Sequence, residues 1–268
     1  MRIIRFVDAG GQSWFGREVD GGRAEVLDGD LRAGFGATGK VVEVRRRLAP
    51  LAPVNLFCVG LNYRAHAAEA GLPLPESPVL FMKPTTAVCG PGDPIRLPAC
   101  AAGPEVDYEC ELAVVIGTEA RDVPEDRALE HVFGYTAAND VSARRWQQHN
   151  GGQWVRGKSF DSFCPLGPVL VTRDEIPDPQ TLGLRTLLNG AVMQEGCTDD
   201  MIFPVARIVS FLSQDTTLLP GTVILTGTPP GVGFVRNPPV FLRPGDRVTV
   251  EVDGVGAMTN PVVGATGR

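Results

Sequence analysis

Two glutamates that introduce an apolar segment are the strongest chemical signal in this chain. Glu109 and Glu111 are followed by residues 112–116, which are apolar and rich in β-branched side chains and end at Gly117, as a buried strand would. Alternate side chains of a strand share one face, so both carboxylates should point the same way. Neighbouring carboxylates at the edge of a core are unfavourable unless a positive charge offsets them. We therefore interpret the pair as part of a divalent-metal site, with the solvent face of an edge strand as the common alternative.

Asp140 is the third candidate ligand. It follows a run of apolar and small residues at 134–139 and precedes residues 142–148, which are able to form a short helix. A strand end that leads into a helix often carries site residues, although an Asp that starts a helix is an equally good explanation by itself. Three carboxylates form an all-oxygen ligand set, which favours Mg²⁺, Mn²⁺ or Ca²⁺ over zinc and leaves coordination positions for water or substrate. Asp107 shares the face of Glu109 and is expected to support the site from behind.

A histidine and a glutamate three residues apart are the candidates for proton transfer. Residues 60–71 read as one short helix, with Asn62 as its N-terminal cap and Gly71 at its end. His66 and Glu69 would then be neighbours on one helix face, where the carboxylate raises the basicity of the imidazole and orients it. We interpret the pair as a base that activates water. An exposed polar pair of no catalytic importance is the commoner alternative.

Lys158 is a candidate for pairing with the acids, and its surroundings have a second interpretation. Residues 152–159 match the nucleotide-binding pattern G-x-x-x-x-G-K-[ST] letter for letter. That pattern functions only between a strand and a helix, whereas the polar residues 147–151 precede it and Pro165 follows closely. We therefore consider the match accidental. A lysine in an acidic pocket would pair with carboxylates and present its charge to an oxyanion, while a solvated surface lysine is the commoner case.

A loop rich in glycine and proline follows the predicted strand at 222–225. Residues 226–233 read TGTPPGVG, and such a loop is rigid and exposes backbone N–H groups and hydroxyls. Thr228 in this loop could therefore bind a substrate carboxylate. The alternative is a tight connection without a binding role.

The composition limits the class of protein. The chain has 268 residues, of which 43% are hydrophobic, with a net charge of −6 and a pI near 5.2. A nucleic-acid surface is therefore not expected. No apolar segment reaches the ~18 residues needed to span a bilayer, and the start of the chain lacks a signal-peptide pattern, so we expect a cytoplasmic protein without membrane contact. The six cysteines form no C-x-x-C pair, which argues against a zinc site and a disulfide framework.

Turn signals divide the chain into two expected units. Residues 1–50 alternate short apolar runs with Gly-rich turns and predict a small N-terminal β unit, after which residues 51–268 would form the catalytic domain. The second unit contains many turns with proline and glycine, so many short strands are expected. The clearest helix would open with Pro204 in its first turn and run to about Ser213. The expected fold class is α+β with more strand than helix.

Six segments in this order resemble the fumarylacetoacetate hydrolase family: GLNYRAHAAEAG, VLFMKP, DYECELAVVIG, ANDVSAR, GKSFD and TGTPPGVG. The similarity extends from about Phe57 to Phe234. The resemblance implies a mixed β-sandwich roll, a homodimer and a Mg²⁺ or Mn²⁺ ion, for which Ca²⁺ could substitute in vitro. It also implies residue roles, namely Glu109, Glu111 and Asp140 as metal ligands, His66, Glu69 and Lys158 in catalysis, and Gln147, Thr228 and Arg144 in contact with the substrate.

The predicted activity is hydrolysis of a carbon–carbon bond in a 1,3-diketo acid of the 3-acylpyruvate class, which gives pyruvate and a carboxylic acid. In this hypothesis His66, oriented by Glu69, activates water, and Lys158 stabilises the oxyanion together with Gln147. An oxaloacetate decarboxylase or a 2-hydroxyhepta-2,4-diene-1,7-dioate isomerase would use the same site without water attack on a ketone. A non-catalytic protein with a structural Ca²⁺ ion is the remaining alternative.

Overall fold

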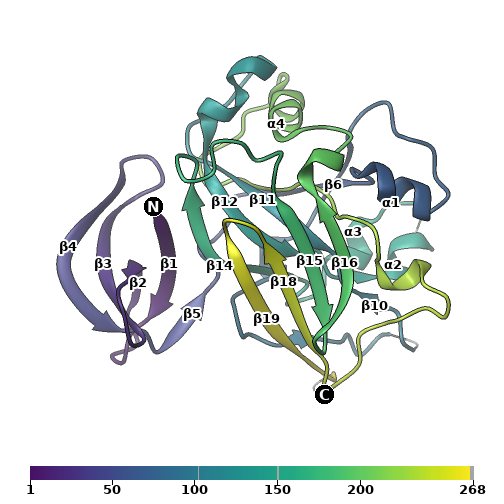
Figure 1. The fold of residues 1–268 in the computed structure, drawn as a ribbon, viewed down its shortest axis with the longest axis horizontal. Coiled ribbons are helices and arrows are strands. Elements are labelled where there is room, and N and C mark those ends of the chain that lie inside the picture. The colour runs from purple at the N-terminus through teal and green to yellow at the C-terminus, as the bar shows by residue number, and fades with distance from the viewer. Residues whose placement is uncertain (102, 150, 266–268) are drawn as a thin grey trace.

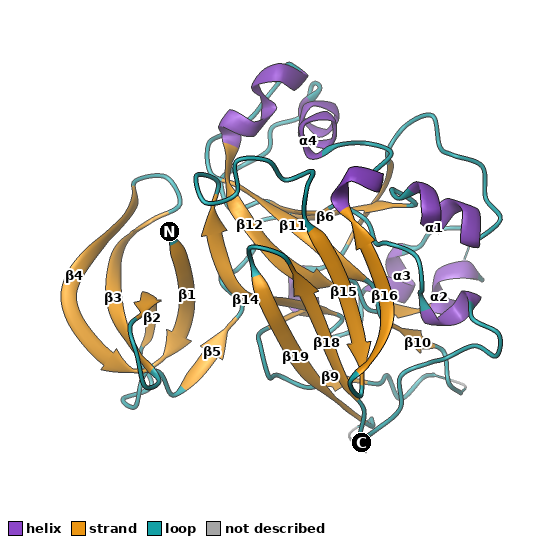
Figure 2. Ribbon diagram, viewed as in Figure 1, coloured by secondary structure: helices purple, strands orange, loops and turns teal. Residues whose placement is uncertain are grey.

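Strands dominate the architecture (Figure 2). The computed structural model describes residues 1–101, 103–149 and 151–265. Within these residues the chain forms one large sheet, one sheet of five strands, a two-stranded ribbon and several short helices. The predicted α+β class with more strand than helix is confirmed.

The large sheet joins the N-terminal strands to the centre of the molecule. Its strand order is β4 (Gly34–Glu43), β3 (Arg23–Asp30), β2 (Ser13–Glu18), β1 (Arg2–Val7), β14 (Cys164–Thr172), β12 (Val132–Asn139), β11 (Cys110–Ile116), β17 (Val223–Leu225), β6 (Leu56–Gly60) and β7 (Val79–Met82). In addition, β5 (Arg46–Leu48) pairs with β1, and β8 (Val88–Cys89) pairs with β14.

The remaining strands and the helices lie around this sheet (Figure 1). The five-stranded sheet has the order β16 (Ala191–Cys197), β15 (Gly183–Leu188), β18 (Arg247–Val252), β19 (Gly256–Val263) and β9 (Ile95–Arg96), and the ribbon pairs β10 (Val106–Asp107) with β13 (Ser142–Ala143). The helices are α1 (Arg64–Glu69), α2 (Arg144–Gln148), α3 (Val155–Lys158) and α4 (Val205–Ser213), with 3₁₀ turns at Thr85–Ala87, Glu125–His131, Thr198–Asp200 and Gly233–Val235.

The first strands form a layer beside the rest of the molecule, at the left of Figure 1. Strand β1 pairs with β14, with Arg2 opposite Val171 and Ile3 opposite Leu170. The N-terminal strands are therefore hydrogen-bonded to the large sheet as well as to one another. The strands expected before residue 50 are present, while a division into independent units at residue 50 stays a prediction.

Strand β11 is buried on both faces and forms the middle of the fold. It lies between β12 and β17, antiparallel to both. Leu112 and Val114 belong to one hydrophobic core, and Ala113 and Val115 belong to the other. Since neither face meets water, the strand reads as a continuous apolar run rather than an alternating one. Glu111 has the same parity as Ala113, so its side chain leaves the strand on that second side.

Two helix predictions had different outcomes. Helix α4 follows Pro204 directly and buries Ile208, Val209 and Leu212, as its apolar stripe predicts. The prediction that Asn62 caps α1 is wrong, because the helix starts two residues later and no side chain caps it. The amide of Asn62 instead donates to the carbonyls of Phe203 (3.0 Å) and Thr226 (2.7 Å). It thus joins two distant loops, an arrangement that local sequence does not reveal.

Two expectations about the whole chain concern membranes and thiols. Within the described part of the chain, no helix is both long and apolar enough to cross a membrane.

All six cysteines are free thiols, and Cys58, Cys110 and Cys164 are buried. Burial raises the pKa of the Cys164 thiol to about 12, which keeps it protonated and unreactive at neutral pH.

Candidate active site

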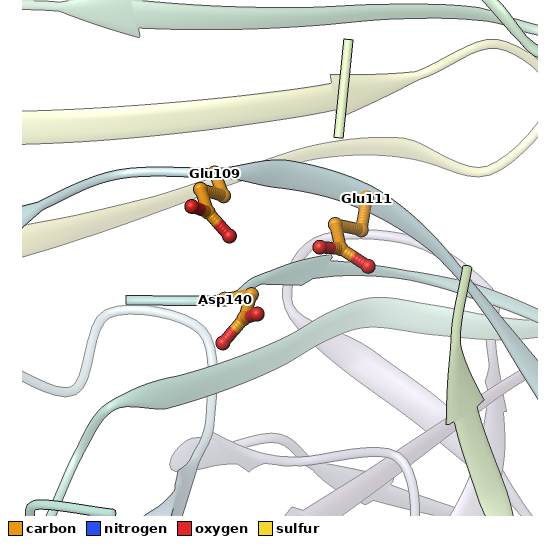
Figure 3. Close-up of side chains that lie close together, drawn as sticks. All are labelled: Glu109, Glu111 and Asp140. Atoms are coloured by element: carbon orange, nitrogen blue, oxygen red, sulfur yellow. The ribbon is translucent and has the colours of Figure 1, made fainter. Parts of the chain in front are cut away.

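Three carboxylates converge where β11 begins and β12 ends (Figure 3). One oxygen each of Glu109, Glu111 and Asp140 lies within 4.8 Å of the others, and all three residues are buried. The antiparallel register places Cys110 opposite Asn139, so the residues flanking this pair are neighbours in space. The N–H of Asp140 also donates to the carbonyl of Glu109 at 2.8 Å. Strand pairing therefore brings together acids that lie about thirty residues apart in sequence.

Glu109 is neutralised by a cation at each of its oxygens. The ammonium nitrogen of Lys158 lies 2.7 Å from Oε2 of Glu109 and 2.6 Å from Oδ2 of Asp140, and a guanidinium nitrogen of Arg144 lies 2.7 Å from Oε1 of Glu109. Burial alone would raise the pKa of Glu109, but the charges of Lys158 and Arg144 outweigh it and hold that pKa well below its usual range. Glu109 is therefore ionised without any further partner.

Arg144 is itself fixed by Asp107, the acid predicted to support the site. The guanidinium donates to Oδ2 of Asp107 through Nε (2.9 Å) and Nη2 (2.6 Å). The β10–β13 pairing sets Asp107 opposite Ser142, two residues before the arginine. The backbone N–H of Gly233 donates to the second oxygen of Asp107 at 2.8 Å. Asp107 thus positions a cation that contacts Glu109, and its carboxylate is not part of the three-acid cluster.

Glu111 carries the uncompensated charge of the cluster. Its Oε2 accepts a hydrogen bond from the backbone N–H of Gly227 at 2.6 Å. Burial, followed by the charges of Asp140 and Glu109, raises the pKa of Glu111 well above its usual range. A cation bound here would reverse that effect, because it would favour the ionised carboxylate.

The cluster fits a divalent cation. Oδ1 of Asp140 is buried and accepts no hydrogen bond of good geometry from the described residues. The ammonium groups of Lys83 and Lys158 lie beside the two oxygens of Asp140, so the charge that the protein does not balance is that of Glu111. The donor set consists of oxygen atoms, which hard cations such as Mg²⁺ and Mn²⁺ prefer. The predicted metal ligands are therefore brought together in an arrangement that could hold such an ion.

Lys83 is a site residue that the sequence interpretation missed. Its ammonium nitrogen lies 2.7 Å from Oδ1 of Asp140 and donates to three carbonyls, those of Val141 (3.1 Å), Lys158 (2.7 Å) and Phe163 (2.8 Å). A signal for it was present, because the chain has 25 basic residues of the Lys and Arg types and only three of them are lysines. Lys83 and Lys158 are both buried in this site.

His66 and Glu69 meet on α1, as their spacing predicts. Nδ1 of His66 lies 2.7 Å from Oε1 of Glu69, and the backbone N–H of Gly231 donates to the other glutamate oxygen at 2.8 Å. The carboxylate therefore fixes the imidazole and ties α1 to the glycine-rich loop. Because Nδ1 is engaged, Nε2 is the ring nitrogen available for proton exchange.

Most of the predicted site residues line one pocket. It has a volume of about 130 Å³, and it is lined by eight of the nine predicted residues, with Glu69 behind His66. Gln147 accepts a hydrogen bond from Arg144 at 3.0 Å. The hydroxyl of Thr228 donates to the carbonyl of Cys110 (2.9 Å) and accepts from Gln194 (2.8 Å), so part of its bonding capacity is used inside the protein.

The nucleotide-binding match around Lys158 has the wrong local structure for phosphates. Lys158 is the last residue of α3, whereas a phosphate-binding lysine opens a helix. The next element along the chain is strand β14, which starts at Cys164. Gly157 is required for packing instead, since a Cβ atom there would lie 2.4 Å from the backbone nitrogen of Gln147. This close contact sets α3 against α2 and aims Lys158 at the acids.

Comparison with known proteins gives a consistent picture. The family described as "Fumarylacetoacetate (FAA) hydrolase C-terminal" matches residues 55–263. The mitochondrial oxaloacetate tautomerase fahd2 of Xenopus laevis is 50% identical over 218 residues, which cover 81% of this chain and 68% of that protein.

Two solved mycobacterial structures match nearly the whole chain. The 5-carboxymethyl-2-hydroxymuconate delta-isomerase from Mycobacterium smegmatis has 43% identity and a TM-score of 0.85, and the match covers 98% of this chain and 100% of that one. The 2-hydroxyhepta-2,4-diene-1,7-dioate isomerase from Mycobacterium marinum has 40% identity and a TM-score of 0.84 over all of both chains. The protein therefore belongs to the fumarylacetoacetate hydrolase family.

Proposed function

We propose that this protein is a metal-dependent enzyme that moves a proton at the enolisable carbon of a small 2-oxo acid bearing a second carbonyl group, as oxaloacetate and the 3-acylpyruvates do. The observation that carries the proposal is the position of His66, a proton-transfer group that lines the same pocket as the three carboxylates. The names of the matched proteins support this reaction class, because tautomerases and isomerases shift protons and double bonds without releasing a fragment.

The charged end of the pocket would bind the 2-oxo carboxylate. A Mg²⁺ or Mn²⁺ ion held by Glu109, Glu111 and Asp140 would draw electron density from the substrate oxygens and thereby stabilise the enol form. Lys158 uses two of its three N–H groups on Glu109 and Asp140, and the third is available for a substrate oxygen. Burial of Lys158 lowers its pKa, but Asp140 and Glu109 raise it more, so the side chain stays an ammonium group.

His66 would carry the proton. Glu69 accepts the proton on Nδ1 in a hydrogen bond, which selects the tautomer with a basic Nε2. Nε2 takes a proton from carbon 3 of the substrate and returns it to the oxygen on carbon 2. The imidazole returns to its starting form at the end of the cycle, so tautomerisation consumes no net proton.

Hydrolysis of a 3-acylpyruvate is the second candidate. The fixed orientation of His66 favours this reaction. Its imidazole is bound to Glu69, which in turn accepts a hydrogen bond from Gly231, and a base oriented in this way could also activate water. In that reaction one water adds to the distal carbonyl, the carbon–carbon bond breaks, and pyruvate and one carboxylic acid leave. The two candidates share every binding group and differ only in what His66 deprotonates.

One pair of assays separates the candidates. The first follows the ultraviolet absorbance of the enol form of oxaloacetate after chelation and after Mg²⁺ or Mn²⁺ is restored. The second measures pyruvate and the matching carboxylic acid from short 3-acylpyruvates, and CO₂ from oxaloacetate. Metal-dependent acceleration of enol decay supports the tautomerase. Pyruvate with a matching acid supports the hydrolase, and pyruvate with CO₂ supports a decarboxylase.

Variants of two histidines provide the matched control. His66→Ala should lower the rate by about 10²-fold or more, the usual contribution of a positioned general base. His131 lies outside the pocket and contacts the carbonyl of Glu119, so His131→Ala should leave the rate unchanged. Equal rates for wild type and His66→Ala, with metal present, would refute the proposed role.

The homodimer implied by the family resemblance remains a proposal as well. Size-exclusion chromatography with light scattering would report a mass near twice that of the 28.6 kDa chain if it is correct. A mass of one chain across the concentration range would contradict it.

A further inference from the structure

The pocket has a charged end and an apolar end. The apolar end is formed by residues that the proposed reaction does not use, namely Val59, Leu61, Leu72, Phe81 and Trp154. Trp154 and Phe81 are its large aromatic members, and their ring centroids lie 5.7 Å apart at an angle of 62°. Aromatic pairs in this edge-to-face geometry favour a fixed mutual orientation.

Trp154 is joined to the charged end through a single helical turn. It precedes α3, whose last residue is Lys158, and residues four apart lie on one side of a helix. Phe81 lies between the two, because the Lys158 ammonium nitrogen is 5.0 Å from the centroid of its ring. The series Lys158, Phe81, Trp154 therefore leads from the charged end of the pocket to its apolar end.

Gly60 allows Trp154 to occupy this position. A Cβ atom on Gly60 would lie 2.1 Å from Cζ3 of the indole and 2.9 Å from Cη2, and its three nearest atoms all belong to that ring. The indole thus rests directly on the backbone at the end of β6. Any side chain at residue 60 would displace it.

We infer that Trp154 limits the bulk of the substrate group remote from the 2-oxo carboxylate. The inference rests on the proposed function, because that function places the carboxylate end against Lys158 and the acids. With that end fixed, the rest of the molecule extends towards Phe81 and Trp154. The indole packs against this group and closes the space beyond it, so Trp154 acts as a specificity-determining residue.

The test measures affinity as well as turnover. Calorimetry on the Mg²⁺-loaded protein would use 2-oxobutanoate, 2-oxohexanoate and phenylpyruvate, and kcat/KM would be measured for 3-acylpyruvates of increasing acyl size. Wild type should prefer the small members. Trp154→Ala should raise the affinity and the kcat/KM for the bulky substrates by about tenfold or more relative to the smallest one. Even one methylene group changes substrate discrimination on that scale. Trp154→Phe should lie between the two, and thermal unfolding would establish that each variant is folded.

A double-mutant cycle tests the contact itself. Gly60→Ala should alter the size profile when Trp154 is present, because the added methyl group displaces the indole. It should have no effect on the profile in the Trp154→Ala background, where the clash is absent. An equal effect of Gly60→Ala in both backgrounds would overturn the inference. Trp14, which contacts Asp8 and Lys40 in the N-terminal sheet, provides the control variant Trp14→Ala with an unchanged profile.

The outcomes separate this inference from the proposed function. If the affinities follow the residue at position 154 while no 2-oxo acid is turned over, the proposed function fails and the specificity role stands. If small substrates are turned over while Trp154→Ala, Trp154→Phe and Gly60→Ala leave the size profile unchanged, the specificity role is wrong and the function stands.

Discussion

Lys83 and Asp140 form an ion pair of 2.7 Å in which the lysine side chain has 0% and the aspartate side chain 1% of its surface exposed. The same ammonium group binds the carbonyl of Lys158, so one nitrogen holds both a candidate metal ligand and the backbone of the residue that neutralises the cluster. Burying such an ion pair costs desolvation free energy. Removing only one of the two partners is strongly destabilising, because the other charge then stays buried without a partner. Lys83 therefore acts as an internal support for the whole carboxylate end of the pocket.

Replacing Lys83 should destabilise the protein and weaken metal binding together. Lys83→Met leaves three carbonyls without their donor and Oδ1 of Asp140 without its cation, a loss on the order of 3–5 kcal/mol. Chemical denaturation and Mg²⁺ titration calorimetry would measure the two effects. Lys40→Met is the control, because Lys40 is exposed on the N-terminal sheet and should change neither quantity appreciably. Unchanged stability of Lys83→Met would show that the buried cation is dispensable.

Amide substitutions at the two glutamates should have opposite effects on the metal-free protein. Glu111→Gln removes an uncompensated charge and should raise Tm, whereas Glu109→Gln deprives Lys158 and Arg144 of their partner and should lower it. Differential scanning calorimetry of chelator-treated samples at neutral pH would measure both. A decrease of Tm in both variants would contradict the charge balance described for the cluster.

The pH dependence of these effects follows from the two pKa shifts. The pKa of Glu111 is raised above its usual 4.5, so the stability associated with this group is present below pH 4.5 and is lost as the pH rises through the folded-state pKa. The gain in Tm from Glu111→Gln should therefore grow as the pH rises above 4.5. The pKa of Glu109 is lowered, so its contribution is present above pH 4.5 and disappears as the pH falls below it. The Tm loss in Glu109→Gln should shrink in that acidic range.

Removing a metal ligand should abolish metal-dependent turnover. Glu109→Ala should lower kcat by about 10²-fold or more, which is the scale for loss of one electrostatic stabiliser. Chelation of the wild type should have at least the same effect and should be reversed by added Mg²⁺ or Mn²⁺. Steady-state kinetics across a series of metal concentrations would measure this. Wild-type turnover by Glu109→Ala at saturating metal would exclude this residue as a required ligand.

The acids of the site were predictable because their signal is local. Glu109 and Glu111 are two residues apart, which is the period of a strand, so their common face follows from the spacing. Asp140 joins them because β11 and β12, which are consecutive long strands in the chain, pair antiparallel. His66 and Glu69 were found for the same reason, since one helical turn places them together. In each case the contacting residues lie on one element or on two consecutive strands.

The features that sequence analysis missed depend on contacts between distant segments. Lys83 is placed by carbonyls that are 58 to 80 residues further along the chain. The local sequence predicts Asn62 as a helix cap, because Asn is a preferred residue at that position. Its side-chain amide instead donates hydrogen bonds to carbonyls in loops more than 140 residues away. The contact of Trp154 with Gly60 is of the same kind, because nothing in either local sequence indicates the other.

The scarcity of lysine has a practical consequence for handling the protein. Of the three lysines, Lys83 and Lys158 are buried and Lys40 is exposed. Among the lysines, amine-reactive reagents will therefore attach to the folded protein at Lys40, which lies on β4, away from α1, α2 and α3 (Figure 1). Immobilisation through Lys40 should leave the pocket facing solution, without a tag or an introduced cysteine.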